Sequence, residues 1–185
     1  MADPVKRLGG FKVLKDLKAG KGGQGTVYQA VCEEPRFEAV PVGTVVALKV
    51  MAVQDDDDGS AFRKLEERTK LLVTLVHPNV VRYYGCFREA GEFSDLHVIV
   101  QEFVEGPSLE KLIAESPRGL DVDVALPLAN QIAAGLEYTV SKGVVHRDIK
   151  PGNVIVAAGN TPKLIDFEVA HNVEGPTTVD GSNLI

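Results

Sequence analysis

The sequence predicts an α+β fold in two parts, a β-rich first part that contains one helix and a mostly helical second part. Strand-like apolar runs separated by turn residues fill the first 53 residues, helical spacing begins at residue 60, and helical patterns return from residue 107. The chain has 185 residues, of which 44% are apolar and 25% are charged. Such a composition is ordinary for a globular protein and is enough for one substantial core or two small lobes.

Five strands are predicted in the first part of the chain. Residues 11–20 and 25–32 predict two strands around a glycine-rich turn, and residues 43–53 predict a third. The stretch between the second and third strands is longer than a tight hairpin needs, so we expect a surface excursion there. Residues 80–87 and 96–103 predict two further strands.

The single helix of the first part is predicted at residues 60–76. The sequence Pro78-Asn79 then breaks the helical pattern. One face of this helix is expected to carry Phe62, Leu65, Thr69, Leu72 and Val76, which follow the 3.6-residue period.

The second part predicts two helices and then two short strands. Residues 108–116 form a short helical pattern and residues 123–143 a long one, with Pro127 near its first turn. The strands are predicted at residues 153–158 and 162–167, which places Asp166 inside an apolar strand. An unpaired charge in such a place is costly, so a specific role for this carboxylate is expected.

Charge and cysteine content exclude several classes of function. The net charge of −6 comes from 26 acidic and 20 basic residues with no basic block, so a nucleic-acid partner has little electrostatic support. Cys32 and Cys86 lie far apart without a CxxC motif, which favours a reduced intracellular chain over a disulfide scaffold or zinc site. No signal-peptide core or membrane-length apolar run occurs, so we expect a soluble cytoplasmic protein.

The four acidic residues at 55–58 are interpreted as a solvated loop, although adjacent carboxylates can also bind a cation.

Two features of the first part have both a functional and a structural interpretation. The stretch "GKGGQGTV" places Gly20, Gly22 and Gly25 before a strand. Glycines let backbone N–H groups approach a phosphate, but a flexible hairpin explains the same pattern. Lys49 in "VALKV" is either a lysine at a sheet edge whose ammonium reaches solvent or a cation directed at nucleotide phosphates.

The segment "VVHRDIKPGNVIV" carries the strongest chemical signal. It gathers Asp148, Lys150 and Asn153 between a helix and a strand. A carboxylate, an ammonium and an amide together suit deprotonation of a hydroxyl, neutralisation of a transferred phosphoryl group and metal coordination. Asp166 follows Asn153 across the predicted strand pair, and two oxygen ligands with phosphate oxygens make a magnesium site.

These motifs occur together, in order, with "HPNVVRYYG", "VQEFVEGPSL" and "IDF". The whole chain therefore resembles the eukaryotic protein kinases. Lys150 after the aspartate favours the Ser/Thr type, and "HPNVVRYYG", "VEG" and "HRDIKP" look most like NIMA-related kinases. The resemblance implies a kinase-like two-lobed fold with an N-lobe and hinge at 1–105, and a partial C-lobe at 106–185 that holds the catalytic loop and the start of the activation segment.

The resemblance also implies ATP and Mg²⁺ as cofactors and a role for each motif residue. Asp148 would be the catalytic base, Lys150 would support the transferred phosphoryl group, and Asn153 and Asp166 would bind magnesium. The remaining nucleotide contacts would come from Gly20, Gly22 and Gly25 over the phosphates, Lys49 on the phosphates, Glu102 and Val104 through their backbone on adenine, and Val27, Ala47 and Ile155 around the base. Gln101 would be the gatekeeper, and Leu72, Tyr83, His146 and Phe167 would stack as an apolar spine.

Three departures from the family pattern put activity in question. Arg68 stands where a helix glutamate should pair with Lys49. Adjacent Glu67 would point about 100° away, unless a local register shift brings it to this position. Glu168 replaces the glycine that follows the Asp-Phe pair, and the chain ends at Ile185 before the later helices of the family. We therefore expect impaired activity and a partner for the apolar face of the long helix, comprising Leu128, Ile132, Leu136 and Val140.

Several functions remain open at this point. The chain is either a protein Ser/Thr kinase acting on a protein substrate or a pseudokinase that binds nucleotide or serves as an interaction scaffold. A truncated remnant without a settled fold is the third alternative. "IDFE" is also found in small-molecule kinases of the choline and aminoglycoside type, which makes a small-molecule phosphotransferase a minor alternative. Thr177 and Thr178 are candidate phosphorylation sites, with Arg147 as the phosphate partner.

Overall fold

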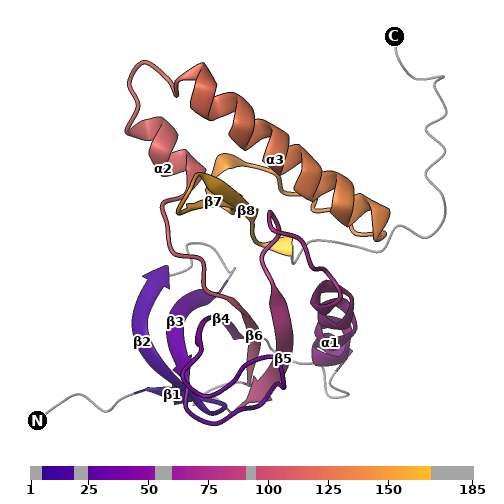
Figure 1. Ribbon diagram of the computed structural model, residues 1–185. Helices are drawn as coiled ribbons and strands as arrows, with labels where there is room; N and C mark the ends of the chain where they lie inside the picture. The colour runs from indigo at the N-terminus through magenta and orange to yellow at the C-terminus, as the bar shows by residue number, and fades with distance from the viewer. Residues whose placement is uncertain (1–5, 19–24, 53–59, 91–94, 168–185) are drawn as a thin grey trace, which may run out of the picture.

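The computed structural model of the chain describes residues 6–18, 25–52, 60–90 and 95–167. These residues form two lobes joined by residues 103–107 (Figure 1). The first lobe is a curled sheet with one helix, and the second contains two helices and a strand pair. The predicted α+β class and two-lobed arrangement are confirmed.

The N-lobe is an antiparallel sheet of six strands in the order β1-β2-β3-β4-β6-β5. All five predicted strands are present, and β1 is an additional short strand that pairs with β2. The surface excursion predicted between the second and third strands is also present, at residues 33–44. The strands are β1 (Arg7–Leu8), β2 (Phe11–Lys18), β3 (Thr26–Cys32), β4 (Val45–Ala52), β5 (Tyr83–Glu89) and β6 (Leu96–Glu102).

Side chains along β4 point alternately to the core of the N-lobe and to the cleft between the lobes. Val46, Leu48 and Val50 are buried in the N-lobe core with residues of β2, β3 and β6. Because successive side chains of a strand point to opposite faces, Ala47 and Lys49 lie on the other face of β4. This face carries the residues that the sequence analysis assigned to the nucleotide.

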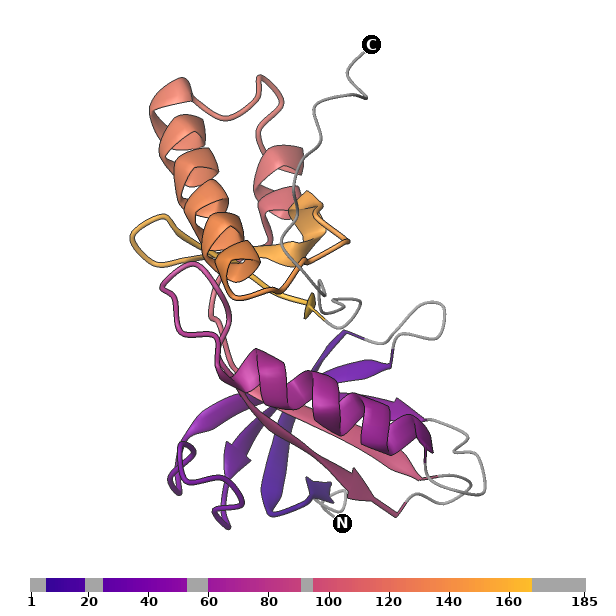
Figure 2. The same ribbon diagram turned by 90° about the vertical axis from the view of Figure 1, so that its right-hand side faces the viewer.

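The second core joins the two lobes. Helix α1 (Ser60–Val73) packs along β5 and lies across one side of the sheet (Figure 2). The C-lobe contains α2 (Leu109–Ala114), α3 (Val122–Ser141), a 3₁₀ turn at Pro151–Asn153, β7 (Val154–Ala157) and β8 (Thr161–Leu164). Residues of α1, the 75–83 segment, β6 and the β7–β8 hairpin are buried together: Leu72, Leu75, Val80, Val81, Tyr83, Ile99, Val144, Val154, Leu164 and Phe167.

Helix α1 ends three residues earlier than its periodicity predicts. The N–H groups of Thr74 and Leu75 bond to the carbonyls three residues back, at 3.1 Å each, which tightens and closes the last turn. Leu75 is thereby buried, whereas Val76 is 65% exposed. The prediction that Val76 continues the buried face is wrong, because the chain has already left the helix.

Pro127 is the sixth residue of α3 and so lies near its first turn, as predicted. Helix α3 differs from the prediction in one respect. The face that was expected to lack neighbours is largely covered, because α3 packs on β8. Leu128 is 2% exposed, and Ile132 and Leu136 pack against the second core, while Val140 is 54% exposed.

Within the described residues, no helix combines the length and the apolar character that crossing a membrane requires.

Gly106 allows the linker between the lobes to lie against β7. A Cβ at this position would be 2.1 Å from the carbonyl oxygen of Val156. We therefore expect Gly106→Ala to lower the free energy of unfolding by about 3 kcal/mol, measured by urea denaturation. Gly119→Ala is the matched control: its φ of +81° is also left-handed, but nothing lies within 4 Å, so only about 1 kcal/mol of backbone strain is expected. Equal losses in the two variants would contradict the account.

Candidate active site

An ion pair joins the two lobes at the cleft. Lys49 Nζ lies 2.7 Å from Asp166 Oδ1, although 117 residues separate the two in sequence. Strand β4 lies between β3 and β6, and Lys49 is only 6% exposed, so this is not a solvated lysine at a sheet edge. A buried ammonium requires a partner, and a carboxylate from the other lobe provides it.

Asp166 lies outside the strand in which the sequence analysis placed it. Strand β8 ends at Leu164, and Asp166 has a φ of +72°. Arg147, beside Asp148, has a φ of +65°. Left-handed backbone is unfavourable for residues other than glycine, and such strain concentrates at functional sites. The two strained residues flank the interlobe cleft from two segments of the C-lobe.

Asp148, Lys150 and Asn153 form one hydrogen-bonded group. Lys150 Nζ lies 2.7 Å from Asp148 Oδ2, and Asn153 Nδ2 donates to the same oxygen at 2.9 Å and to the Asp148 carbonyl at 2.8 Å. The hydrogen bond from Lys150 is the main cause that lowers the pKa of Asp148, and the same bond raises the pKa of Lys150. Both groups therefore stay charged at neutral pH, as a carboxylate and an ammonium.

Backbone hydrogen bonds hold this group against the segment that carries Asp166. The Ile165 N–H donates to the Asn153 carbonyl at 3.0 Å. His146 Nε2 lies 2.8 Å from the Ile165 carbonyl, and His146 Nδ1 accepts from the Asp148 N–H at 3.3 Å. Since Nδ1 accepts and Nε2 donates, His146 is neutral with its proton on Nε2. Burial lowers the pKa of His146, which favours the same state.

The four residues expected to stack as a spine come together from four separate segments. The rings of His146 and Phe167 have centroids 4.3 Å apart, and those of Tyr83 and Phe167 are 6.5 Å apart. The Tyr83 hydroxyl also accepts a hydrogen bond from the Phe167 N–H at 3.1 Å. Leu72 of α1 is buried in the same core. The spine links helix α1, strand β5 and both segments of the candidate site.

The residues expected around adenine lie on both sides of the cleft. Val27 is opposite Lys49 in the β3–β4 register, and Ala47 is opposite Gln101 in the β4–β6 register. Ile155 of β7 comes from the C-lobe and is half-buried. Among the described residues, the N–H of half-buried Val104 donates no hydrogen bond. A polar backbone group at such a place needs an acceptor from water or a ligand.

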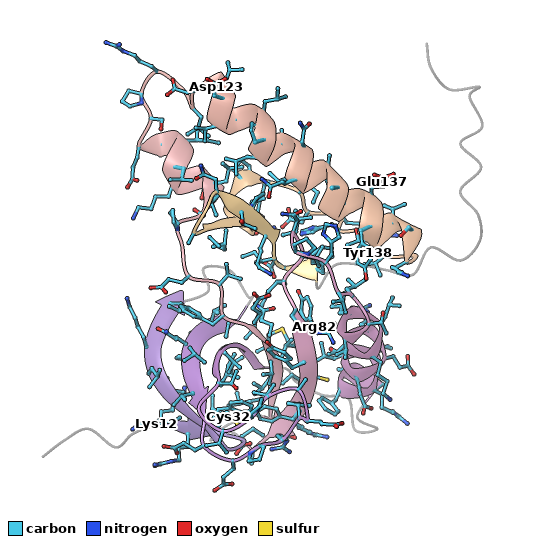
Figure 3. The ribbon with its side chains drawn as sticks, viewed as in Figure 1. Lys12, Cys32, Arg82, Asp123, Glu137 and Tyr138 are labelled. Carbon is cyan, nitrogen blue, oxygen red and sulfur yellow. The ribbon has the colours of Figure 1, made fainter. Side chains whose placement is uncertain are left out.

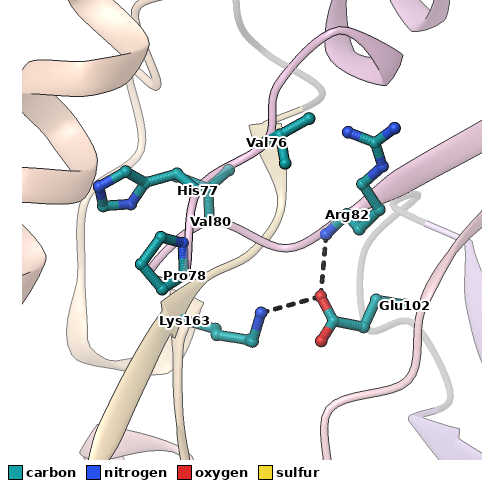
Figure 4. A pocket seen from close by; sticks show the side chains of 7 residues that line it. All are labelled: Val76, His77, Pro78, Val80, Arg82, Glu102 and Lys163. Atoms are coloured by element: carbon teal, nitrogen blue, oxygen red, sulfur yellow. Dashed lines mark hydrogen bonds and ion pairs between the residues drawn. The ribbon is translucent and has the colours of Figure 1, made fainter.

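The side chain of Glu102 makes a second connection between the lobes. Its Oε2 accepts from the Arg82 N–H at 3.1 Å and from Lys163 Nζ of β8 at 3.0 Å (Figure 4). These residues border a pocket of about 300 Å³, together with Val76, His77, Pro78 and Val80. Lys163 was not predicted as a site residue, although a charge in a short apolar strand is the same signal that marked Asp166.

Of the glycine motif, only Gly25 lies among the described residues, and Gly20 and Gly22 lie outside them. Gly25 has a φ of +82°, and a Cβ there would be 2.3 Å from the Val50 carbonyl oxygen. Glycine is therefore required where β3 begins against β4. Glu168, Thr177 and Thr178 also lie outside the described residues.

Arg68 and Glu67 are both exposed on α1. The inward face of the helix carries Leu65, Thr69 and Leu72 instead. Arg68, which occupies the position where a glutamate was expected, therefore points to solvent.

Two oxygen atoms at the site suit a hard cation. The amide nitrogen of Asn153 is engaged by Asp148, and Lys49 binds Oδ1 of Asp166. Within the described residues, Asn153 Oδ1 and Asp166 Oδ2 have no protein partner. No cluster of three or more acidic, His or Cys residues that could hold a metal occurs there either. This donor set fits Mg²⁺, which is usually bound by one or two carboxylate or amide oxygens together with phosphates and water.

The protein kinase domain family matches residues 13–183. The chain belongs to this family. Its relatives include serine/threonine-protein kinase pkn2 of Myxococcus xanthus, with 37% identity over 90% of this chain and 19% of the relative. Mitogen-activated protein kinase kinase kinase 5 of Arabidopsis thaliana is 34% identical over 93% of this chain and 23% of its own length. Serine/threonine-protein kinase PrkC of Bacillus subtilis is 30% identical over 97% of this chain and 26% of its own length.

This kinase-domain chain thus spans between about a fifth and a quarter of the length of these relatives. The two bacterial relatives are named as serine/threonine-protein kinases, which supports assignment to the Ser/Thr type.

The neutral state of His146 predicts a pH dependence of stability. Because the folded-state pKa lies below the unfolded value near 6.5, the unfolded chain takes up a proton first as the pH falls. Chemical denaturation should therefore show a free energy of unfolding that decreases from pH 7 to pH 5. His146→Gln should be less stable at pH 7 but have a flatter slope over this range. An unchanged slope in the variant would refute the assignment.

Proposed function

We propose that this chain binds ATP with Mg²⁺ in the interlobe cleft and transfers the γ-phosphoryl group to a serine or threonine hydroxyl of a protein substrate. The observation that carries this proposal is the Lys49–Asp166 ion pair beside the group formed by Asp148, Lys150 and Asn153. These side chains come from three segments that have no other evident reason to bring five polar groups to one cleft.

Each residue has a distinct part in the proposed reaction. Lys49 binds the phosphates, and its position is fixed by Asp166. Asp148, kept ionised by Lys150, orients the attacking hydroxyl and accepts its proton. The new bond forms between the hydroxyl oxygen and the γ-phosphorus as the bond from the γ-phosphorus to the bridging oxygen of ATP breaks, and ADP leaves. Lys150 Nζ lies close enough to Asp148 to neutralise negative charge on the transferred phosphoryl group. Bound magnesium would hold the phosphate oxygens and offset their charge, with Asn153 and Asp166 as its protein ligands.

We also propose the finer features of the assignment. Residues 1–105 would act as the N-lobe and hinge and residues 106–185 as the C-lobe portion. The motifs "HPNVVRYYG", "VEG" and "HRDIKP" support a relationship to the NIMA-related kinases. A cytoplasmic location is compatible with the described residues, which contain no membrane-spanning helix.

A nucleotide-binding scaffold is the second candidate function. Arg68 favours it, because α1 offers an exposed cation where the family has an acid that pairs with the strand lysine. In this case the chain would bind Mg·ATP through Lys49, Asn153 and Asp166 without measurable transfer.

The Asp148→Asn variant distinguishes the two candidates. We expect it to lower γ-phosphoryl transfer to a generic Ser/Thr peptide by about 100-fold or more, because the general base is lost, with little change in ATP affinity. Asp95→Asn is the matched control, since Asp95 pairs with Arg88 on the surface, and it should keep full transfer. Nucleotide binding without transfer in the unsubstituted chain would favour the scaffold. Transfer that persists in Asp148→Asn would refute the proposed base.

A further inference from the structure

The side chain of Gln101 lies on the face of β6 that borders the cleft. Val100 is buried in the N-lobe core, so Gln101, the next residue of the strand, points to the opposite face. Gln101 is opposite Ala47 in the β4–β6 register, and Lys49 follows Ala47 by two residues on the same face of β4. Gln101 therefore shares a face with the lysine proposed to bind phosphate and with a residue expected to pack against the base.

Within the described residues, Gln101 is a buried polar side chain without a protein partner. It is 8% exposed, and its carboxamide makes no hydrogen bond there. The other buried polar or charged side chains each have a hydrogen bond, an ion pair or a ring contact: Lys49, Thr69, Asn79, His97, Thr139, His146 and Asn153. A buried amide without a partner loses the hydrogen bonds that water gives it, so such groups are almost always satisfied. Neither carboxamide atom of Gln101 is fully enclosed, so a molecule in the cleft can reach both.

The backbone that carries this carboxamide is fixed on both sides. Gln101 lies between two neighbouring strands, opposite Ala47 of β4 and Tyr83 of β5. The next residue, Glu102, donates its N–H to the Arg82 carbonyl at 2.7 Å, and its carboxylate accepts the Arg82 N–H at 3.1 Å. Figure 3 shows Arg82 near the junction of the two lobes. Because the end of the strand is held in place, the missing partner has to come to the carboxamide.

The polar groups at this edge of the cleft match the edges of adenine. The Val104 N–H, three residues beyond Gln101, also lacks an acceptor among the described residues. A carboxamide offers an acceptor and a donor side by side. Adenine presents an acceptor at N1, a donor at the N6 amine and an acceptor at N7, and a glutamine amide can pair with N6 and N7 together. Guanine presents two acceptors, O6 and N7, in place of the second pair, which would leave the amide oxygen unpaired.

We propose that the Gln101 carboxamide binds the base of ATP, with its oxygen accepting from the N6 amine and its nitrogen donating to N7. The Val104 N–H then meets N1 on the adjacent edge of the base. This contact rests on the proposed nucleotide site and adds a side chain to it, since Glu102 and Val104 are expected to contact adenine through their backbone alone. Gln101 is thus a specificity-determining residue, because it makes N7 part of what the chain recognises.

The analogue 7-deaza-ATP, in which a C–H group replaces N7, tests the proposal. Isothermal titration calorimetry with Mg²⁺ gives the Kd of ATP and of 7-deaza-ATP for the 185-residue chain. We expect 7-deaza-ATP to bind about 10-fold more weakly than ATP, because the amide donor of Gln101 is then buried without an acceptor. Equal affinities would overturn the proposal, since a carboxamide that binds only water does not sense the loss of N7.

The Gln101→Met variant assigns the effect to this side chain. Methionine is of similar size but cannot pair with N6 and N7, so the variant should bind ATP about 10-fold more weakly and 7-deaza-ATP as tightly as ATP. Gln131→Met is the matched control: it is the same change on α3, where Gln131 bonds to Asn79, and it should keep the preference for ATP. A preference that persists in Gln101→Met contradicts the proposal. Gln101→Leu takes the place of this variant if Gln101→Met lacks a cooperative thermal transition.

The nucleotide pair also separates the role of Gln101 from the proposed function. Binding of ATP without a preference over 7-deaza-ATP overturns the role of Gln101 and leaves the nucleotide site in place. Binding of neither nucleotide overturns both.

Discussion

The candidate site depends on one constraint, the burial of the Lys49 ammonium on an inner strand of the N-lobe. A cation that is only 6% exposed is stable only beside an anion, and the anion here is Asp166 of the other lobe, at 2.7 Å. The pair fixes β4 relative to residues 165–167. His146 and Asn153 bond to Ile165, so the segment that carries Asp148 is held to the same place. The polar groups of the cleft thus form one connected unit.

A second ion pair limits how the lobes can move about their linker. Lys49–Asp166 lies in the cleft, and Lys163–Glu102 joins β8 to the last residue of β6, where the linker begins. Glu102 also receives the Arg82 N–H, so its carboxylate connects β6, the chain before β5, and β8. The backbone of the same residue is proposed to contact adenine. The position of this backbone therefore depends on the bonds that the Glu102 side chain makes with Arg82 and Lys163.

Local patterns predicted the elements well and their ends less well. Alternation and turn residues located seven strands and three helices, because local sequence sets these periodicities. The end of α1 and the place of Asp166 were missed because backbone hydrogen bonds end each element before the sequence pattern does. At α1 the bonds are local, from the Thr74 and Leu75 N–H groups to carbonyls three residues back. After β8 the bond is long-range, from the Ile165 N–H to the Asn153 carbonyl, and Asp166 then has left-handed backbone. For the site, motif spacing predicted which residues meet, but a single sequence held no sign that Glu102 pairs with Lys163.

The proposed function requires that Lys49, Asn153 and Asp166 form a nucleotide and magnesium site in the folded chain. The most direct test is thermal unfolding with and without Mg·ATP, for the unsubstituted chain, Asp166→Asn and the surface control Asp95→Asn. We expect a stabilisation of about 2.7 kcal/mol at a hundredfold excess over the dissociation constant for the first and third proteins, and little or none for Asp166→Asn. Equal stabilisation of all three, or of none, would contradict the claim.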